Sequence, residues 1–526
     1  MEKGSGLLLH ISSLPSKHGI GTFGREAHAF IKFLVKSKQK YWQMLPLNPT
    51  SYGDSPYQSF SAFALNPYFI DLDILVHEGL LTKKEVKKIK GGSNPHFVDY
   101  GKVYNERFDV LRLAYQRGYA QLEEEIAKFY HKHKYWLEDY ACFMLLKGLH
   151  GGKSFQDWKR DYRLHKKTAI RKAKEANIDE YRFWIFVQYQ AFKQYGKLKA
   201  HAKRKGIKLI GDMPIYVSLD SADVWGHPKL FKLDQNRRPE AVAGVPPDFF
   251  SATGQLWGNP IYDWDKLKKT NYYWWRKRVQ AASKLFDCVR IDHFRGFESY
   301  WSIPFGEKTA INGEWVKGPD YDLFEHLKSC TKKCQIIAED LGVITDAVKE
   351  LKNRTGFPGM KLMQFAFDDY ERHLSGIYYD DDPNERGGAD FSNCHTEQDY
   401  KEAKLKNPFL PHNYEENCIA YLGTHDNDVM TNFIEEHPEL KGPMKDYLRI
   451  WDDKDILDTM IGALIRSRAN VVILSPQDLL HMDKYSRMNT PGVASGNWQF
   501  RIDKQDLSNE LANHLAIMTM EANRDE

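Results

Sequence analysis

Short apolar runs recur along this chain, and each is followed by a polar loop. Their length and their content of β-branched residues predict buried strands. The runs occupy residues 4–10, 41–45, 207–212, the start of the stretch 287–296, 334–340, 360–365, 418–422 and 470–474. Helical patterns follow most of them. Buried parallel strands that alternate with helices are typical of a (β/α)8 barrel, so the sequence predicts an α/β fold of the TIM-barrel type.

Long insertions interrupt this alternation. Charged helical patterns fill residues 80–205 (104–115, 121–129, 136–149 and 181–204), which predicts a large helical insertion after the second strand. Together with the loop before it, the insertion forms an expected subdomain over residues 50–205. Residues 368–406 are polar, rich in Gly and Asp and without apolar periodicity, so we expect an exposed or partly disordered insertion there. We interpret residues 1–526 as one catalytic barrel with these additions.

Two segments without periodicity, 49–67 and 243–264, combine aromatic residues with Gly and Pro. Such segments at the mouth of a barrel are typical of binding loops. Tyr52 and Tyr57 in the first segment are candidates for stacking on a ligand, although packing in the core explains them equally well.

Composition narrows the class of protein. The hydrophobic content is 42%, and the mean hydropathy is −0.60. No apolar run approaches the ~20 residues that span a bilayer, and the N-terminus lacks the apolar core of a signal peptide. Six cysteines are too few for a disulfide framework in a chain of 526 residues. We therefore predict a cytoplasmic protein that does not act at a membrane.

Charge and aromatic content point to the ligand. Lys and Arg number 75 against 71 Asp and Glu, a balance that gives no reason to expect a nucleic acid partner. The chain has 13 Trp, 29 Tyr and 29 Phe, and many of them lie in loops rich in Gly and Pro. Because sugars stack their C–H faces on aromatic rings, this composition favours a carbohydrate ligand.

The stretch 287–296, DCVRIDHFRG, carries the first candidate for catalysis. Side chains alternate along a strand, so Arg290 and Asp292 share the face opposite to Val289 and Ile291. A neighbouring guanidinium favours an ionised carboxylate, which a nucleophile or a stabiliser of a transition state requires. Taken alone, however, the stretch favours an ordinary Arg–Asp pair at the end of a strand.

Carboxylates follow other predicted strands as well, namely Asp212, Glu339 and Asp426. Catalytic residues of TIM barrels lie at these carboxyl ends. Retaining glycosidases use two carboxyl groups about 5–5.5 Å apart, one as nucleophile and one as acid and then base. The apolar residues before Glu339 should raise its pKa and suit it to the second role. A divalent metal could use the same carboxylates, but the aromatic surroundings and the absence of clustered His argue against one, so we predict no metal and no cofactor.

Long motifs in order along the chain resemble the amylomaltases, the 4-α-glucanotransferase or disproportionating-enzyme family of the α-amylase clan. They are GDSPYQSFSAFALNPYFIDL (53–72), GDMPIYVSLDSADVW (211–225), AGVPPDFFSATGQLWGNPIYDW (243–264), VRIDHFRG, IIAEDLG, GFPGMKLMQFAFD (356–368), GTHDND and MNTPG…GNWQFR (488–501). They extend over nearly the whole chain.

The resemblance implies a role for each matching residue. Asp292 would be the nucleophile that forms a β-glycosyl-enzyme, Glu339 the general acid/base and Asp426 the third carboxylate, which binds the donor sugar in its distorted shape. Substrate-binding positions would be Arg290, His425, Asp212, Tyr57, Gln255, Trp257 and Asn489. The segment 229–267 would cover the active site and favour attack by a sugar 4-hydroxyl over water.

The implied activity is transfer of an α-1,4-glucan segment, with retention, from a donor glucan or maltooligosaccharide to an acceptor glucose or glucan. The alternatives are an α-1,4-glucan hydrolase and a glucan-binding protein without catalysis. Two departures from the family pattern bear on acceptor use: Ala252 replaces an acidic residue, and an insertion follows Phe367.

Overall fold

The centre of the protein is a sheet of parallel strands. The computed structural model describes residues 1–526 except 52, 248–250, 333, 343, 368–395 and 526. Eight strands form the sheet in the order β10-β11-β12-β1-β2-β3-β6-β9. Their bounds are β1 Gly4–Leu8, β2 Tyr41–Gln43, β3 Lys208–Pro214, β6 Cys288–Asp292, β9 Gln335–Ala338, β10 Gly359–Leu362, β11 Cys418–Tyr421 and β12 Val471–Leu474. Each strand overlaps one of the predicted apolar runs.

The two outer strands of this order meet and close the barrel. The amide N–H of Ala338, at the end of β9, donates to the carbonyl oxygen of Pro358 just before β10, with N and O 2.9 Å apart. The predicted (β/α)8 barrel is therefore confirmed, and the carboxyl ends of all its strands point to one mouth.

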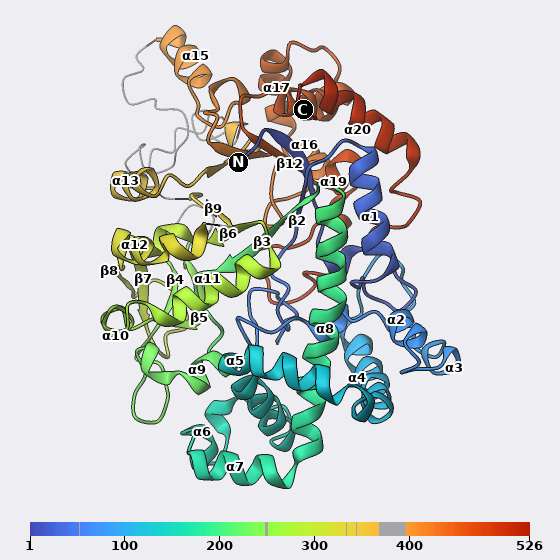
Figure 1. The fold of residues 1–526 in the computed structure, drawn as a ribbon. Coiled ribbons are helices and arrows are strands. Elements are labelled where there is room, and N and C mark those ends of the chain that lie inside the picture. The colour runs from blue at the N-terminus through green and yellow to red at the C-terminus, as the bar shows by residue number, and fades with distance from the viewer. Residues whose placement is uncertain (52, 248–250, 333, 343, 368–395, 526) are drawn as a thin grey trace.

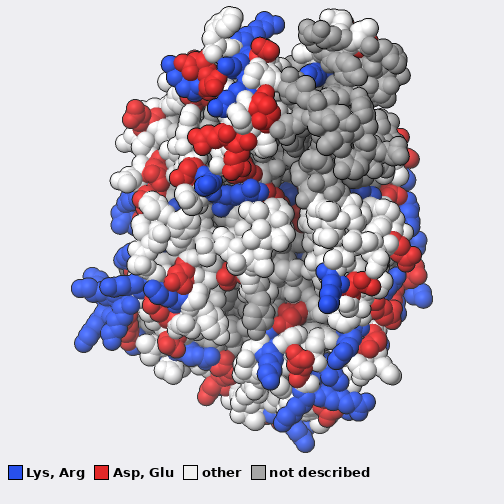
Figure 2. Space-filling view, turned by 180° about the vertical axis from the view of Figure 1, so that it is seen from behind, with Lys and Arg blue, Asp and Glu red and all other residues white. Residues whose placement is uncertain are grey.

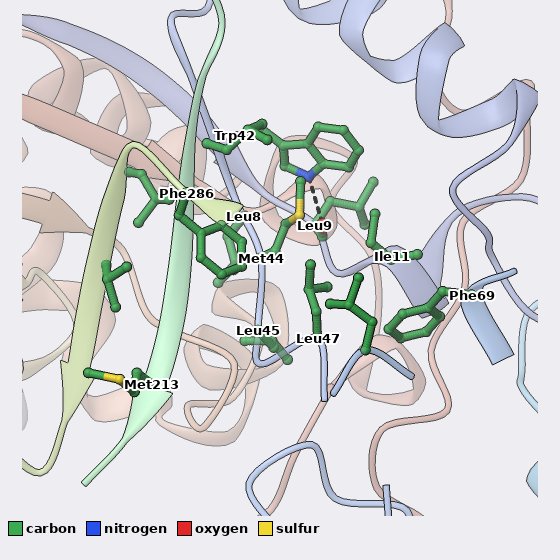
Figure 3. Packing of buried hydrophobic residues seen from close by; sticks show 14 of the residues in the cluster. Leu8, Leu9, Ile11, Trp42, Met44, Leu45, Leu47, Phe69, Met213 and Phe286 are labelled. Carbon is green, nitrogen blue, oxygen red and sulfur yellow. Dashed lines mark hydrogen bonds between the residues drawn. The ribbon is translucent and has the colours of Figure 1, made fainter. Parts of the chain in front are cut away.

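The core begins between the first three strands. Trp42 of β2 is fully buried, and its indole N–H donates to the carbonyl oxygen of Leu9 over 2.8 Å (Figure 3). This bond satisfies the polar atom that burial would otherwise leave without a partner. Close approach of β1 to β2 requires glycine at position 6, because an added Cβ would lie 2.3 Å from the carbonyl oxygen of Tyr41.

Helices surround the barrel (Figure 1). They are α1 Arg25–Lys36, α9 Ala222–Gly226, α10 Trp264–Lys269, α11 Tyr273–Leu285, α12 Asp320–Thr331, α13 Asp346–Thr355, α16 Met430–Glu436, α17 Lys441–Leu448, α18 Ile456–Ile465, α19 Pro476–Leu479 and α20 Asn509–Glu521. None of the helices in the described part of the chain is both long and apolar enough to cross a membrane.

The helical insertion lies between β2 and β3, as predicted, and most of it extends below the barrel in Figure 1. Its helices are α2 Leu72–His77, α3 Lys83–Val86, α4 Tyr100–Gly118, α5 Glu123–Leu149, α6 Arg160–Arg163, α7 Lys167–Ala176 and α8 Ile178–Arg204. Helix α5 is continuous where the sequence predicted two helices. No Gly or Pro separates residues 129 and 136, so nothing in the chain ends the helix there.

A second sheet was not predicted. Its antiparallel strands are β4 Ala241–Val245, β5 Gln255–Pro260, β7 Ser299–Pro304 and β8 Glu314–Lys317, in the order β5-β4-β7-β8. The segment 243–264, which we predicted as a loop, thus contributes two strands. Frequent Gly and Pro hide their alternation, and the partner strands β7 and β8 come from a distant part of the chain.

Most of the predicted polar insertion, residues 368–395, lies outside the described residues. Its final part forms helix α15, Glu397–Leu405, which the sequence pattern did not predict. A capping box starts this helix: the Thr396 hydroxyl accepts the Asp399 amide N–H, and the Asp399 carboxylate accepts that of Thr396.

Candidate active site

The central strand β6 places two charged side chains on the inside of the barrel. Register pairs Arg290 with Asp212 of the neighbouring strand β3, so their side chains lie on the same face. One guanidinium nitrogen of Arg290 is 2.8 Å from Asp212 Oδ2, and another is 3.0 Å from Asp292 Oδ1. Arg290 is only 2% exposed. The guanidinium therefore fixes both carboxylates from a buried position.

Two opposing effects set the charge of Asp292. Burial raises the pKa of Asp292 to about 6, and the neighbouring guanidinium of Arg290 opposes that rise. The sequence revealed only the guanidinium. Because about 6 is still below neutral pH, Asp292 remains mostly ionised, as expected from the sequence.

Glu339 follows strand β9 and lies beside Asp292. Its backbone N–H donates to the carbonyl oxygen of Ile291 over 3.1 Å. Its carboxylate accepts the amide N–H of His293 over 2.8 Å and that of Leu341 over 2.9 Å. His293 directly follows Asp292 in the chain. The bond from the His293 N–H to Glu339 therefore links the two carboxyl groups through one backbone segment.

The pKa of Glu339 is higher than that of Asp292. Burial raises the pKa of Glu339 to about 7; Arg290 lowers it, and the charge of Asp292 raises it further. Near neutral pH, Glu339 can therefore hold a proton while Asp292 is charged. A pair of carboxyl groups with separate pKa values can supply one acid and one nucleophile.

A second group of contacts surrounds Asp426, in the loop after β11. Asn489 donates its side-chain N–H to Asp426 Oδ1 over 2.7 Å, and His425 Nε2 is 3.4 Å from Asp426 Oδ2. Tyr57 joins this group to the first one, because its hydroxyl is 3.0 Å from Asp212 Oδ2 and 2.8 Å from His425 Nε2. The Tyr57 and His425 rings are stacked, with centroids 5.3 Å apart.

The protonation of His425 follows from its surroundings. Burial lowers the pKa of His425, and this outweighs the opposing effect of Asp426. A neutral His425 with its proton on Nε2 donates to the Tyr57 oxygen, while the Tyr57 hydroxyl donates to Asp212. Arg290 and Tyr57 thus both donate to Asp212, which holds this carboxylate from two sides.

Strand β5 of the second sheet brings Gln255 and Trp257 to the site. The Trp257 indole N–H donates to Gln255 Oε1 over 3.1 Å. The Trp257 and His293 rings contact each other edge to face, with their centroids 4.8 Å apart and their planes at 90°. Every residue proposed for the site from the sequence is therefore joined to the others by these contacts, except that Tyr52 lies outside the described residues.

Sequence reasoning missed three contributors. His293 has a φ of 58°, a left-handed conformation that is costly for a residue other than glycine, yet its N–H holds Glu339. The Trp498 ring lies 5.7 Å from Tyr57, and Arg487 donates to the carbonyl oxygen of Asp426 over 3.1 Å. His293 and Trp498 stand within recognised motifs, but Arg487 carries no signal because its contact is to the backbone of a distant loop.

No group of three or more His, Cys, Asp or Glu within the described part of the chain is placed to hold a metal ion. Two carboxyl groups with different pKa values, beside a polar network and aromatic rings, can cleave and re-form an acetal bond through a covalent intermediate.

Comparisons with known proteins agree with one another. The family model described as 4-alpha-glucanotransferase matches residues 9–383 and 393–507. A 4-alpha-glucanotransferase of Clostridium butyricum is 46% identical over 514 residues, which are 97% of this chain and 99% of that protein. The Thermus thermophilus enzyme of the same name is 42% identical, over 98% of this chain and 97% of that one. The structure of amylomaltase from Streptococcus agalactiae in complex with acarbose has a TM-score of 0.90 and 40% identity, covering 99% of this chain and 100% of that one.

Proposed function

The chain belongs to the 4-alpha-glucanotransferase family, and on that premise we propose how its residues carry out the transfer. The enzyme moves a segment of an α-1,4-glucan or maltooligosaccharide to the 4-hydroxyl of an acceptor glucose or glucan. The observation that carries the residue assignment is the pair of carboxyl groups joined through His293, one with a pKa of about 6 and one of about 7.

In the first half of the reaction, Glu339 donates its proton to the glycosidic oxygen. The bond between that oxygen and the anomeric carbon breaks, and an Asp292 carboxylate oxygen attacks the same carbon from the opposite side. The shortened glucan leaves with a free 4-hydroxyl, and the remaining segment is held as a β-glycosyl ester of Asp292.

In the second half, the roles of Glu339 reverse. Its carboxylate takes the proton of the acceptor 4-hydroxyl, and the acceptor oxygen attacks the anomeric carbon and displaces Asp292. Two inversions give overall retention of the α-linkage. Glu339 ends protonated and Asp292 ionised, so the pair is ready for another cycle.

The polar network orients the donor sugar. Asn489 holds Asp426 through Oδ1, and His425 Nε2 lies 3.4 Å from Oδ2, so the carboxylate is fixed where it can accept from hydroxyls of the sugar. Arg290, itself fixed by Asp212, keeps Asp292 in position for attack. Tyr57, His425, Gln255 and Trp257 complete the substrate-binding set, with the aromatic rings offering faces to the sugar.

Preference for transfer over hydrolysis depends on excluding water from the covalent intermediate. The segment 229–267 provides that cover in our proposal, because its strand β5 carries Gln255 and Trp257 beside His293. The alternative is an α-1,4-glucan hydrolase. The cytoplasmic location inferred from the sequence stays a prediction.

Incubation with maltotriose alone tests the proposed transfer. We expect a ladder of longer oligosaccharides together with released glucose, because each donor segment is passed to another glucan. Separation of the products by chain length checks this. Glucose and maltose without longer chains would instead show that water completes the reaction.

The two carboxyl groups should also produce a bell-shaped pH dependence of kcat/KM. The rate rises with pH as Asp292 ionises near about 6 and falls as Glu339 loses its proton near about 7, so the maximum lies between these values. The two limbs report the coupled pair rather than separate groups. Initial rates of glucose release from maltotriose between pH 4.5 and 9 measure the profile. A rate that stays level up to pH 9 would contradict the assignment of Glu339 as acid.

A further inference from the structure

His293 lies where the barrel meets the second sheet. It directly follows Asp292 of β6, and strand β7 of the second sheet begins shortly after it, at Ser299. Figure 2 is seen from the side on which this sheet lies, behind α11 and α12 in Figure 1, and shows a hollow near the centre of that face. His293 contacts Trp257 of the segment 229–267 and Glu339 of the barrel, so it connects the proposed cover of the site with the acid/base.

The backbone at His293 holds Glu339 through two bonds. The His293 N–H donates to Glu339 Oε2 over 2.8 Å, and the Phe294 N–H donates to the Glu339 carbonyl oxygen over 3.2 Å. His293 has a φ of 58° and a ψ of 50°. Successive N–H groups at a turn of this kind point to the same side, as they do in anion-binding nests. If His293 left the left-handed conformation, its N–H would turn away from the Glu339 carboxylate.

The ring of His293 is the part that can hold this turn. A left-handed conformation is costly for a residue with a Cβ, so contacts around the residue must stabilise it. Trp257 of β5 meets the ring edge to face, and the ring of Tyr216, which follows β3, has its centroid 6.4 Å away. Glycine at position 296 leaves room for the ring, because an added Cβ would lie 2.9 Å from His293 Cδ2. The ring is thus packed between segments from distant parts of the chain.

Trp257 is in turn tied to the aromatic segment 49–67. The Gln58 side-chain N–H donates to the carbonyl oxygen of Trp257 over 3.4 Å and to Asn259 Oδ1 over 3.1 Å. Both segments carry residues of the proposed substrate-binding set, Tyr57 in one and Trp257 in the other. The packing of Trp257 on His293 therefore depends on how these two segments lie over the site.

We propose that His293 is a positioning residue that couples the cover of the site to the acid/base. Packing of Trp257 against the His293 ring holds the left-handed turn, and the turn holds the Glu339 carboxylate through its N–H. Glu339 is therefore in its working position only when β5 lies against His293. This role rests on the proposed function of Glu339. It gives the cover a second effect besides the exclusion of water.

The pKa of Glu339 reports the contact with His293. Burial raises this pKa to about 7, the charges of Arg290 and Asp292 lower and raise it, and the N–H of His293 lowers it. Loss of that donor should move the fall in kcat/KM for maltotriose, which reports the free enzyme, to higher pH by about one unit. The His293 ring does not titrate in this range, because burial and the charge of Arg295 lower its pKa to about 3.

Three variants separate the turn from the ring. His293→Val should show the shift of about one unit and lower kcat by about tenfold or more, because a β-branched residue rarely adopts a φ of 58° and a displaced acid is inefficient. His293→Gly should keep the fall in kcat/KM at the pH of the natural enzyme, since glycine adopts this conformation freely. Trp257→Ala should shift the fall upward in the natural sequence but not in the His293→Gly background, where no ring remains to be held.

His165→Val is the matched control. His165 also has a left-handed conformation, with a φ of 53°, and its ring meets Trp225 edge to face with centroids 4.1 Å apart. It lies in the helical insertion, between α6 and α7. The variant should lose stability in thermal unfolding, as His293→Val does, while the fall in kcat/KM stays at the pH of the natural enzyme. Circular dichroism shows whether each variant is folded, and if His293→Val is not, the Trp257→Ala pair decides.

Several results would overturn the role of His293. They are an unshifted fall in kcat/KM in folded His293→Val or in Trp257→Ala, an equal shift in His293→Gly and His293→Val, and a shift in His165→Val. Absence of any fall in the natural enzyme would instead overturn the acid role of Glu339, and the role of His293 with it. Failure of this proposal alone is therefore distinguishable from failure of the proposed transferase mechanism.

Discussion

Replacement of Asp292 by Asn should lower kcat for disproportionation of maltotriose by at least about 10⁴-fold, because the proposed covalent intermediate forms on this carboxylate. Asn has nearly the same shape, so the contacts of Arg290 with Asp212 are kept. The loss therefore reports the missing nucleophile and not a rearranged site. KM should change much less than kcat, since the proposed donor-binding groups around Asp426 are unchanged.

Mass spectrometry of the quenched enzyme measures this directly. With an activated donor such as α-maltosyl fluoride, the natural enzyme should gain the mass of one maltosyl group, and the Asp292→Asn variant should gain none. Asp287→Asn is a matched control, because Asp287 precedes the same strand at the far end of the barrel and accepts the Leu209 amide N–H over 2.9 Å. That variant should keep its activity if it is folded. Transfer that survives in an Asp292→Asn preparation shown by mass to be free of deamidation would contradict the role of Asp292.

The sequence predicted the barrel and the carboxylates for the same physical reason. Strands buried on both faces, such as β12 with every residue buried, appear as continuous apolar runs. The candidate catalytic carboxylates follow such runs, so their position at the mouth follows from the fold class. The family resemblance then supplied roles that spacing alone left open, as for Tyr57, Gln255 and Asn489. The comparisons confirm the family itself.

Other features depend on contacts between distant segments. Strand β4 is stabilised between β5 and β7, and a pattern within residues 243–264 cannot reveal a partner that begins at Ser299. The sequence did not predict the left-handed conformation of His293. The contact that goes with it, from the His293 N–H to the Glu339 carboxylate, joins two distant segments of the chain. The pKa of Asp292 likewise could not be predicted without knowing how deeply this side chain is buried. The neighbouring Arg290 alone predicted only that the carboxylate is ionised.

Replacement of Glu339 by Gln should separate the two halves of the reaction. Cleavage of maltotriose requires protonation of a poor leaving group, so we expect a loss of about 10²–10⁴-fold in kcat. Fluoride leaves without a proton. Release of fluoride from α-maltosyl fluoride in the first turnover should therefore fall by much less. The second half still needs a base for the acceptor 4-hydroxyl, so the glycosyl-enzyme should accumulate on Asp292.

Rapid quench with mass detection can follow the accumulation of the glycosyl-enzyme. Azide should release the glycosyl group, because azide attacks without a base and would give the α-glycosyl azide if configuration is retained.

In the Glu339→Gln variant, the fall in rate above about pH 7 should disappear for the fluoride donor, since the amide that replaces the Glu339 carboxyl does not ionise. Asp340→Asn is the matched control: this neighbouring carboxylate pairs with Lys352 over 2.7 Å and accepts the Met360 amide N–H. Loss of the Asp340 carboxylate can affect the stability of the fold but should leave the fall in rate above about pH 7 in place. Equal losses on maltotriose and on the fluoride in Glu339→Gln would contradict the acid role, because only a group that protonates the leaving oxygen distinguishes the two donors.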